Sequence, residues 1–193
     1  YPGQEFGNAL VEILTGDVSP SGKLPTTFPI NIKDTPAFSS YPGKDLQMNY
    51  EEKLLVGYKW YERKNIGTLF PFGHGLSYTK FEYSDLKITK INGTEFVCSY
   101  IVKNTGINSG SEVSQCYVGN EEADEMEPIK KLQGFCKTHL EPGEHKEIEI
   151  TLNERSFSNW SVSENTWVVQ NSSHKIFIGA SSEDIRLKSE VNL

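Results

Sequence analysis

From residue 83 onward, short runs of alternating polar and apolar residues are separated by turn residues about every ten positions. The pair Asn92-Gly93 stands between two such runs and is a strong signal for a β-hairpin. Many short strands at this spacing are typical of an antiparallel sandwich, because parallel strands need a longer crossover between them. The expected strands are Tyr83–Ile91, Glu95–Lys103, Glu112–Gly119, Lys131–His139, Lys146–Leu152, Thr166–Val169, Lys175–Ala180 and Ile185–Val191.

The N-terminal stretch has a different pattern. Between Gly3 and Thr15 the apolar residues recur at the spacing of an amphipathic helix, and Gly16 follows as an expected C-cap. Lys23–Phe28 then lies next to two prolines and is expected to form a short strand. A helix followed directly by a strand is typical of the end of an α/β layer. The apolar helix positions are Phe6, Ala9, Leu10, Ile13 and Leu14.

Three further stretches connect these two regions. Residues 30–50 have little periodicity and are expected to form a surface loop. Tyr50–Glu62 carries apolar groups on both faces, which suits an element covered on two sides at a domain junction. Leu69–Tyr78 is rich in aromatic residues and contains Gly73-His74-Gly75, so we expect an extended strut followed by a tight turn.

The fold prediction therefore has three parts. Residues 1–62 are expected to be an α/β remnant, the C-terminal segment of an α/β sandwich domain that is too small to enclose a core. Residues 63–82 are expected to be an aromatic interdomain strut. Residues 83–193 are expected to form an all-β immunoglobulin- or fibronectin III-like antiparallel sandwich.

Charge and hydropathy exclude some partners. The chain has 26 acidic and 19 basic residues and a formal net charge of −7, which argues against binding nucleic acid or an anionic membrane surface. No apolar run approaches the roughly 20 residues that span a bilayer. The start at Tyr1-Pro2-Gly3 shows no targeting signal, which favours a processed or excised piece.

The cysteines and the glycosylation sequons point to different compartments. The odd number of cysteines and the lack of C-x-x-C spacing favour buried reduced thiols, with one disulfide and one free thiol as the alternative. Three N-x-[ST] sequons begin at Asn92, Asn159 and Asn171 and would matter in a secretory compartment. The thiols favour the cytoplasm and the sequons favour secretion, so localisation stays open. The cysteines are Cys98, Cys116 and Cys136.

No catalytic, cofactor-binding or metal-binding residue is predicted. The four histidines lack metal-ligand spacing, and adjacent Glu51 and Glu52 diverge too much to flank one scissile bond. His74, between two glycines, is expected to cap backbone groups in a turn. The acidic stretch Glu121–Glu127 is expected to be a solvated loop, with a cation site as the alternative. There is no G-x-S-x-G motif and no Cys–His pair of a nucleophile and base.

Several long stretches resemble one enzyme family, glycoside hydrolase family 3, and within it the C-terminal part of the β-glucosidases. The resemblance extends over nearly the whole chain. It is carried by Tyr1-Pro2-Gly3-Gln4-Glu5-Phe6-Gly7, Ser21-Gly22-Lys23-Leu24-Pro25, Val56-Gly57-Tyr58-Lys59-Trp60-Tyr61-Glu62, Leu69-Phe70-Pro71-Phe72-Gly73-His74-Gly75-Leu76-Ser77-Tyr78, Leu132-Gln133-Gly134-Phe135 and Leu140-Glu141-Pro142-Gly143.

The resemblance implies a retaining β-glucosidase with a barrel, an α/β sandwich and a fibronectin III-like domain. Its nucleophile would be an aspartate on the barrel and its acid/base a glutamate on the α/β sandwich, about 5 Å apart. No residue of this chain matches either role, so the chain alone is expected to be inactive. The implied partners are the remainder of the same enzyme, a β-glucoside bound mainly outside this chain, and a second copy in a homo-oligomer; no cofactor is implied.

Two roles for the junction aromatics follow. Tyr58, Trp60, Phe70, Phe72 and Tyr78 are expected to clamp the sandwich to the rest of the protein. The alternative is that Tyr1, or Tyr58, Trp60 and Tyr61, stack on a sugar ring. Two alternative functions also stay open: another exo-acting family 3 glycosidase such as a β-xylosidase, and a non-enzymatic β-sandwich binding module.

Overall fold

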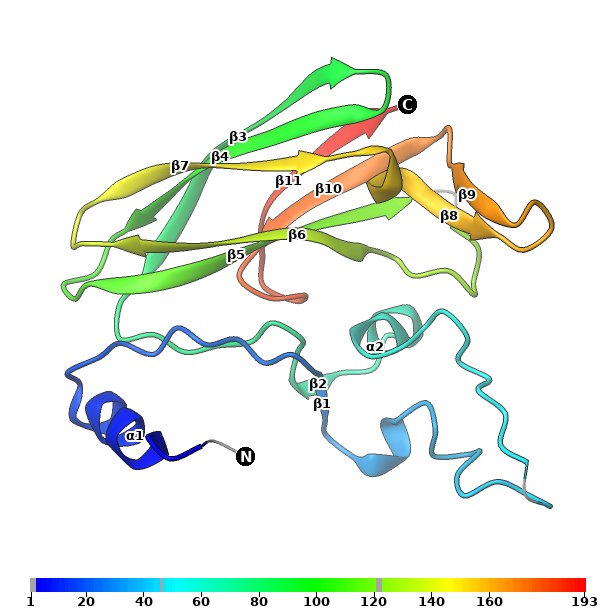
Figure 1. Cartoon of the computed structure of the whole chain (residues 1–193), viewed down its shortest axis with the longest axis horizontal. Coiled ribbons are helices and arrows are strands. Elements are labelled where there is room, and N and C mark those ends of the chain that lie inside the picture. The colour runs from blue at the N-terminus through cyan, green and yellow to red at the C-terminus, as the bar shows by residue number, and fades with distance from the viewer. Residues whose placement is uncertain (1–2, 46, 121–122) are drawn as a thin grey trace.

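The computed structural model describes residues 3–45, 47–120 and 123–193. It contains a β-sandwich and an N-terminal segment of helices and loops that lies along one side of the sandwich (Figure 1). Every strand pair in the sandwich is antiparallel, as predicted from the spacing of the turns. The predicted α/β remnant followed by an all-β sandwich is therefore confirmed.

Two sheets form the sandwich. One has the strand order β3-β4-β7 and the other has the order β11-β10-β5-β6. The hairpin predicted at Asn92-Gly93 joins β3 to β4, with Asn92 opposite Glu95. The strands are β3 (Phe81–Asn92), β4 (Glu95–Asn104), β5 (Gly110–Asn120), β6 (Lys131–Leu140), β7 (His145–Leu152), β10 (Ser173–Gly179) and β11 (Ile185–Asn192).

The core lies between the two sheets. Along β4 and β7 buried and exposed positions alternate, as expected for strands with one face on a core. Fully burying one such apolar side chain stabilises the fold by about 1.5–3 kcal/mol. The largest fully buried apolar side chains of the sandwich are Tyr100, Val102, Tyr117, Val118, Leu140, Leu152, Phe157, Ile176 and Ile178.

One hairpin lies outside both sheets. Strands β8 (Ser158–Ser161) and β9 (Thr166–Val169) pair only with each other among the described strands and follow the 3₁₀ turn η2 (Glu154–Phe157). Trp160 stands opposite Trp167, and their rings meet edge to face with centroids 5.5 Å apart. The sequence predicted β9 but not β8, because Ser-Asn-Trp-Ser carries a single apolar residue.

The N-terminal segment begins with helix α1 (Phe6–Thr15), and Gly16 caps it at φ +88°, as predicted. The strand predicted over Lys23–Phe28 is wrong. The strand β1 covers only Phe28–Pro29 and pairs with β2 (Thr68–Phe70). Pro25 has no N–H to donate, and only Leu24 exchanges backbone hydrogen bonds with the turn at residues 73–74.

Helix α2 (Tyr58–Lys64) lies at the predicted two-sided junction. A 3₁₀ turn, η1 (Ile32–Asp34), interrupts the predicted loop over 30–50.

The tight turn predicted after the strut is confirmed. Gly73 has φ +80°, and the His74 N–H donates to the Pro71 carbonyl at 3.1 Å. The predicted domain boundaries at residues 62 and 82 stay predictions.

The three cysteines are free thiols, with Cys98 and Cys116 buried and Cys136 half-buried. The prediction of reduced thiols in strands is therefore confirmed, and the alternative with one disulfide is wrong. Among the described residues, no helix has the length and apolar character needed to cross a membrane.

Candidate functional site

The candidate site is the junction where the N-terminal segment meets the sandwich. Among the described residues no group of three or more His, Cys, Asp or Glu side chains could hold a metal ion. Of the predicted acidic loop, residues 121–122 lie outside the described residues. The carbonyl oxygens of Asp124 and Glu127 accept hydrogen bonds from Arg63 of α2. This loop therefore contributes backbone acceptors to the junction.

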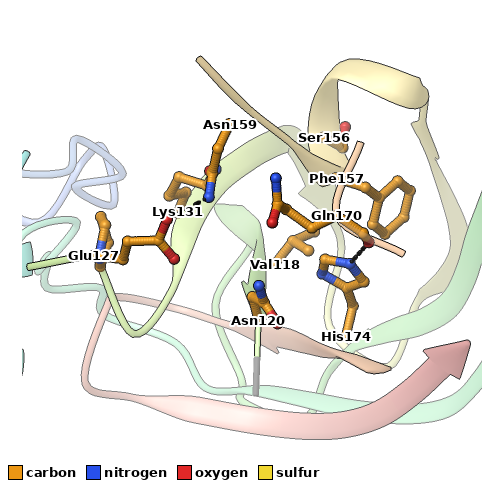
Figure 2. A pocket seen from close by; sticks show the side chains of 10 residues that line it. Val118, Asn120, Glu127, Lys131, Ser156, Phe157, Asn159, Gln170 and His174 are labelled. Carbon is orange, nitrogen blue, oxygen red and sulfur yellow. Dashed lines mark hydrogen bonds between the residues drawn. The ribbon is translucent and has the colours of Figure 1, made fainter. Parts of the chain in front are cut away.

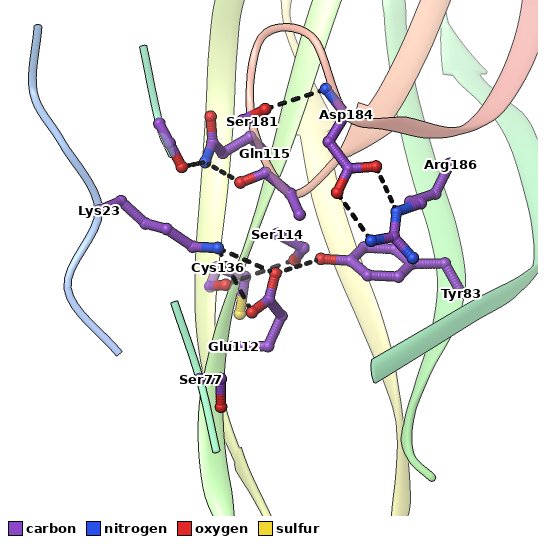
Figure 3. Close-up of polar contacts among 12 residues, drawn as sticks. Lys23, Ser77, Tyr83, Glu112, Ser114, Gln115, Cys136, Ser181, Asp184 and Arg186 are labelled. Atoms are coloured by element: carbon purple, nitrogen blue, oxygen red, sulfur yellow. Dashed lines mark hydrogen bonds and ion pairs between the residues drawn. The ribbon is translucent and has the colours of Figure 1, made fainter. Parts of the chain in front are cut away.

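A buried carboxylate is the centre of the junction (Figure 3). Glu112 on β5 is 6% exposed, and its Oε1 accepts hydrogen bonds from Lys23 Nζ at 3.2 Å and from Tyr83 Oη at 2.8 Å. Burial, and then the negative charge of Glu112, raise the pKa of Tyr83. Tyr83 therefore stays a neutral donor, and Glu112 joins the N-terminal segment to β3 and β5.

A second charge pair lies beside this carboxylate. Arg186 on β11 donates two hydrogen bonds to Asp184, from Nε at 2.5 Å and from Nη2 at 2.7 Å, and its guanidinium lies 5.9 Å from the centroid of the Tyr83 ring (Figure 3). The hydrogen bond to Asp184 raises the pKa of Arg186. The hydrogen bonds to Asp184 thus hold the positive charge of Arg186 at the edge of the Glu112 site.

The side chain of Gln115 links its own strand, β5, to the backbone at Gly73 and at Ala180. Its Nε2 donates to the Gly73 carbonyl at 3.2 Å and to the Ala180 carbonyl at 2.9 Å, and its Oε1 accepts from the Tyr117 hydroxyl. A Cβ added at Gly73 would lie 2.2 Å from Gln115 Oε1. The close approach and the positive φ together explain why a glycine occupies this turn.

The predicted aromatic clamp is confirmed for Tyr58 and Phe72. Their rings stack with centroids 5.0 Å apart, and the edge of Tyr117 on β5 meets Tyr58 at 5.8 Å. The Leu132 N–H donates to the Tyr58 hydroxyl at 2.9 Å, and burial raises the pKa of Tyr58 to about 12. Tyr78 also contributes, because its hydroxyl donates to the Ile13 carbonyl of α1 at 2.8 Å.

The alternative, in which these aromatics stack on a sugar, does not fit Tyr58 and Tyr61, and for Tyr1 and Trp60 it stays a prediction. Tyr58 and Tyr61 are only 9% and 5% exposed, and Trp60 donates from Nε1 to the Asp34 carbonyl at 3.0 Å. Tyr1 lies outside the described residues.

The His74 ring packs on Phe70 with centroids 5.1 Å apart. The hydrogen bonds of the turn at His74 come from the backbone, so the prediction that the His74 ring caps this turn is wrong.

Helix α2 contributes an ion pair. Glu62 Oε1 pairs with Lys130, which also lies 5.6 Å from the centroid of the Tyr117 ring. Glu62 Oε2 is buried without a hydrogen-bond partner among the described residues. Burial raises the pKa of Glu62, and the positive charge of Lys130 opposes this shift.

A separate hollow lies at the end of the sandwich, beside the β8–β9 hairpin (Figure 2). Lys131 donates to Asn159 Oδ1 at 2.8 Å, and Asn159 Nδ2 donates to Glu127 Oε1 at 2.8 Å. On the other side, His174 is 2% exposed and its Nε2 lies 2.8 Å from the Gln170 carbonyl oxygen. Among the described residues that line the hollow, Glu127 is the one carboxylate, so the lining offers no pair of carboxylates for glycosidic chemistry.

The N-terminal segment leaves apolar side chains exposed on its other surfaces. Helix α1 has no buried residue, although one face is apolar, and Leu14 on it is 72% exposed. Exposed apolar patches mark interaction surfaces, ligand-binding grooves or surfaces prone to aggregation. The exposed apolar residues of this segment include Phe6, Leu10, Leu14, Val18, Phe28, Ile30, Ile32, Leu54 and Val56.

Sequence reasoning missed the polar residues of the junction. Lys23, Glu112 and Gln115 stand in ordinary strand-like or turn-like surroundings, and nothing in their local sequence marks a buried contact. Their roles come from partners that are distant in sequence, as with Gln115 and Ala180, which are 65 positions apart.

Comparison with known proteins identifies two matching families. The family model for the glycosyl hydrolase family 3 C-terminal domain matches residues 1–78, and the one for the fibronectin type III-like domain matches residues 112–182. The chain is 43% identical to the thermostable β-glucosidase B of Acetivibrio thermocellus and 38% identical to β-glucosidase B of Emericella nidulans. These alignments cover 99% and 100% of this chain, but only 26% and 24% of the relatives.

Solved structures show the same relation. The GH3 β-glucosidase of Bifidobacterium adolescentis superposes with a TM-score of 0.95 at 37% identity, over 99% of this chain and 28% of that protein. A β-glucosidase of Streptomyces venezuelae, solved in complex with D-glucose, gives 0.94 at 36% identity, over 100% of this chain and 25% of that protein. The chain thus spans about a quarter of the length of these relatives.

Proposed function

We propose, from the premise that this chain belongs to glycoside hydrolase family 3 as the C-terminal part of a β-glucosidase-like protein, that it supports the active site of a retaining β-glucosidase. The whole enzyme would hydrolyse terminal non-reducing β-D-glucosyl residues by double displacement. The nucleophile and the acid/base would both lie outside this chain. The chain would therefore have no turnover by itself.

The observation that carries this proposal is the contrast between the two sides of the N-terminal segment. Toward the sandwich it is held by the Glu112 and Gln115 hydrogen bonds and by the Tyr58 stack. Away from the sandwich α1 buries nothing and presents Leu10 and Leu14. A segment fixed on one side and apolar on the other is suited to join a second body to the sandwich.

The physical role would be to hold two carboxyl groups in register. Retaining chemistry needs a nucleophile and an acid/base about 5 Å apart, on opposite sides of the glycosidic bond. When such groups come from different domains, a misplacement of about 1 Å can lower the rate about 100-fold. A rigid clamp between the acid/base-bearing domain and the sandwich would limit that misplacement.

Hydrolysis by the full-length protein tests the proposal. With 4-nitrophenyl β-D-glucoside we expect turnover, and proton NMR should show β-glucose as the first-formed anomer. Faster cleavage of the β-xyloside would favour the β-xylosidase alternative. Absence of hydrolysis with both substrates, or turnover by residues 1–193 alone, would contradict the proposal.

The partner of the apolar face is part of the same proposal. We expect it to be the remainder of the same enzyme, since the relatives are about four times as long as this chain. Sedimentation of the full-length protein distinguishes this partner from a second copy. If Leu14→Glu dissociated a dimer without changing the hydrolytic rate of each protomer, the face would be an oligomer interface.

A further inference from the structure

The three sequons lie in different structural surroundings. Asn92 is the last residue of β3, at the tip of the hairpin with β4. Asn159 is on β8, inside the β8–β9 hairpin. Asn171 lies between β9 and β10. All three match N-x-[ST], and the structure adds a distinction between them as acceptors of an N-linked glycan.

Asn159 has both ends of its amide engaged. Its Oδ1 accepts from Lys131 Nζ, and its Nδ2 donates to Glu127 Oε1, each at 2.8 Å (Figure 2). The three side chains are all half-buried, and burial lowers the pKa of Lys131. Glycosylation replaces one of the two Nδ2 hydrogens, and the sugar would have to enter the half-buried space between Asn159 and Glu127. Separating the Glu127 carboxylate from its donor there is costly.

Asn92 and Asn171 have no such surroundings. Both residues are exposed, and the one hydrogen bond from the Asn92 amide, to Glu95 Oε2 at 3.0 Å, lies at the surface. The turn at Asn92 continues through Gly93, where an added Cβ would meet nothing within 4 Å. A bulky polar substituent at either position would extend into solvent and displace no packed group.

We propose that Asn92 and Asn171 are N-glycosylation sites of this protein in a cell that translocates it into the endoplasmic reticulum, and that Asn159 stays unmodified. The co-reactant is a lipid-pyrophosphate-linked oligosaccharide. A bond forms between asparagine Nδ2 and C1 of the first sugar, the bond from C1 to the pyrophosphate oxygen breaks, Nδ2 gives up one proton, and the lipid pyrophosphate leaves. Glycans at these positions lie away from the junction with the N-terminal segment.

The test is site occupancy in the secreted full-length protein. The protein is expressed in yeast behind a secretion leader, and folded monomer is digested with peptide N-glycosidase in ¹⁸O water. We expect the 3 Da mass increase of labelled deamidation at Asn92 and at Asn171, and an unchanged peptide at Asn159. Occupied Asn159 in the folded protein, or an unmodified Asn92 or Asn171, would overturn the proposal.

Three matched substitutions separate modification from packing. Asn92→Gln and Asn171→Gln should each remove one glycan and leave the melting temperature of enzymatically deglycosylated protein unchanged. Asn159→Gln should remove no glycan but lower that melting temperature, because its amide no longer fits between Lys131 and Glu127. A glycan lost with Asn159→Gln would contradict the assignment, and so would a stability unaffected by this change.

Discussion

Lys23 Nζ lies 3.2 Å from Glu112 Oε1, although the two residues are 89 positions apart in sequence. Both side chains are largely buried, with exposed fractions of 14% and 8%. Truncating one partner of a buried pair leaves the other charge uncompensated, so Lys23→Met should lower the free energy of unfolding by about 3 kcal/mol. Equilibrium urea unfolding measures this loss.

A matched surface pair serves as the control. Lys146 and Glu144 form an ion pair at 3.4 Å, with exposed fractions of 49% and 37%. Water already screens this pair, so Lys146→Met should change the free energy of unfolding far less than Lys23→Met does. Equal losses for the two variants would show that burial of the Lys23 pair has no energetic weight.

Gly73→Ala should destabilise the attachment of the N-terminal segment. The new Cβ would lie 2.2 Å from Gln115 Oε1, at a residue with φ +80°. The backbone strain alone costs about 1–2 kcal/mol, and the displaced amide adds to it. Hydrogen exchange of the strut, followed by mass spectrometry, should show faster exchange than in the unsubstituted protein.

Gly143 provides a control with the same backbone angle. It also has φ +80°, but an added Cβ there would meet nothing within 4 Å. Gly143→Ala should therefore show the strain without the clash. In a Gln115→Ala background the excess cost of Gly73→Ala should shrink; an unchanged cost would show that Gln115 is not the group displaced.

Ionisation of the Tyr58 hydroxyl should lower the free energy of unfolding at alkaline pH. Burial raises its pKa from 10 to about 12, so the unfolded chain loses the proton first. The contribution of Tyr58 is complete below pH 10, falls as the pH rises to about 12, and amounts to about 2–3 kcal/mol over that window. Tyr58→Phe should reduce the slope of unfolding free energy against pH in this range.

Tyrosinate absorbance at 295 nm, recorded during alkaline unfolding, follows the same group. Tyr41 is 73% exposed, so Tyr41→Phe is the control for loss of a tyrosine hydroxyl at the surface. The hydroxyl of Tyr58 also accepts from Leu132, so Tyr58→Phe should lower stability at neutral pH as well, by about 1 kcal/mol. An identical slope in Tyr58→Phe and in the unsubstituted protein would contradict the prediction.

If α1 contacts the remainder of the full-length protein as proposed, Leu14→Glu should lower the proposed hydrolytic rate, because it would place a carboxylate in that contact. Leu14 is 72% exposed in this chain, so the same change should leave the sandwich stable. Val162, 86% exposed beside β8, is the matched control, and Val162→Glu should keep full activity. Equal activity of both variants would remove α1 from the domain contact.

The sequence predicted the sandwich well because its signals are local. Period-two alternation along β4 and the Asn92-Gly93 turn depend on neighbouring residues only. The predicted strand over Lys23–Phe28 failed because its extended backbone lacks a partner strand, which residue composition does not reveal. Strand β8 was missed because tertiary packing beside η2, rather than alternation, holds Ser158–Ser161 in place.

The sequence predicted the aromatic contacts of the junction but not its hydrogen bonds. Aromatic richness at Tyr58 and Phe72 indicated a packed contact, and the structure contains one. The Glu112 and Gln115 hydrogen bonds depend on which residues the fold brings together, and no local pattern encodes such pairings. The sequence predicted no catalytic residue in this chain, and that expectation stays a prediction.

The single amide of Gln115 ties the strut at Gly73 to Ala180, just before the last strand of the sandwich. The β10–β11 hairpin is thereby mechanically coupled to the N-terminal segment. A lesion in the β10–β11 hairpin would loosen that segment before it unfolded the sandwich. Any effect of such a lesion on the proposed activity would then come from a loosened junction rather than from the loss of a reacting group.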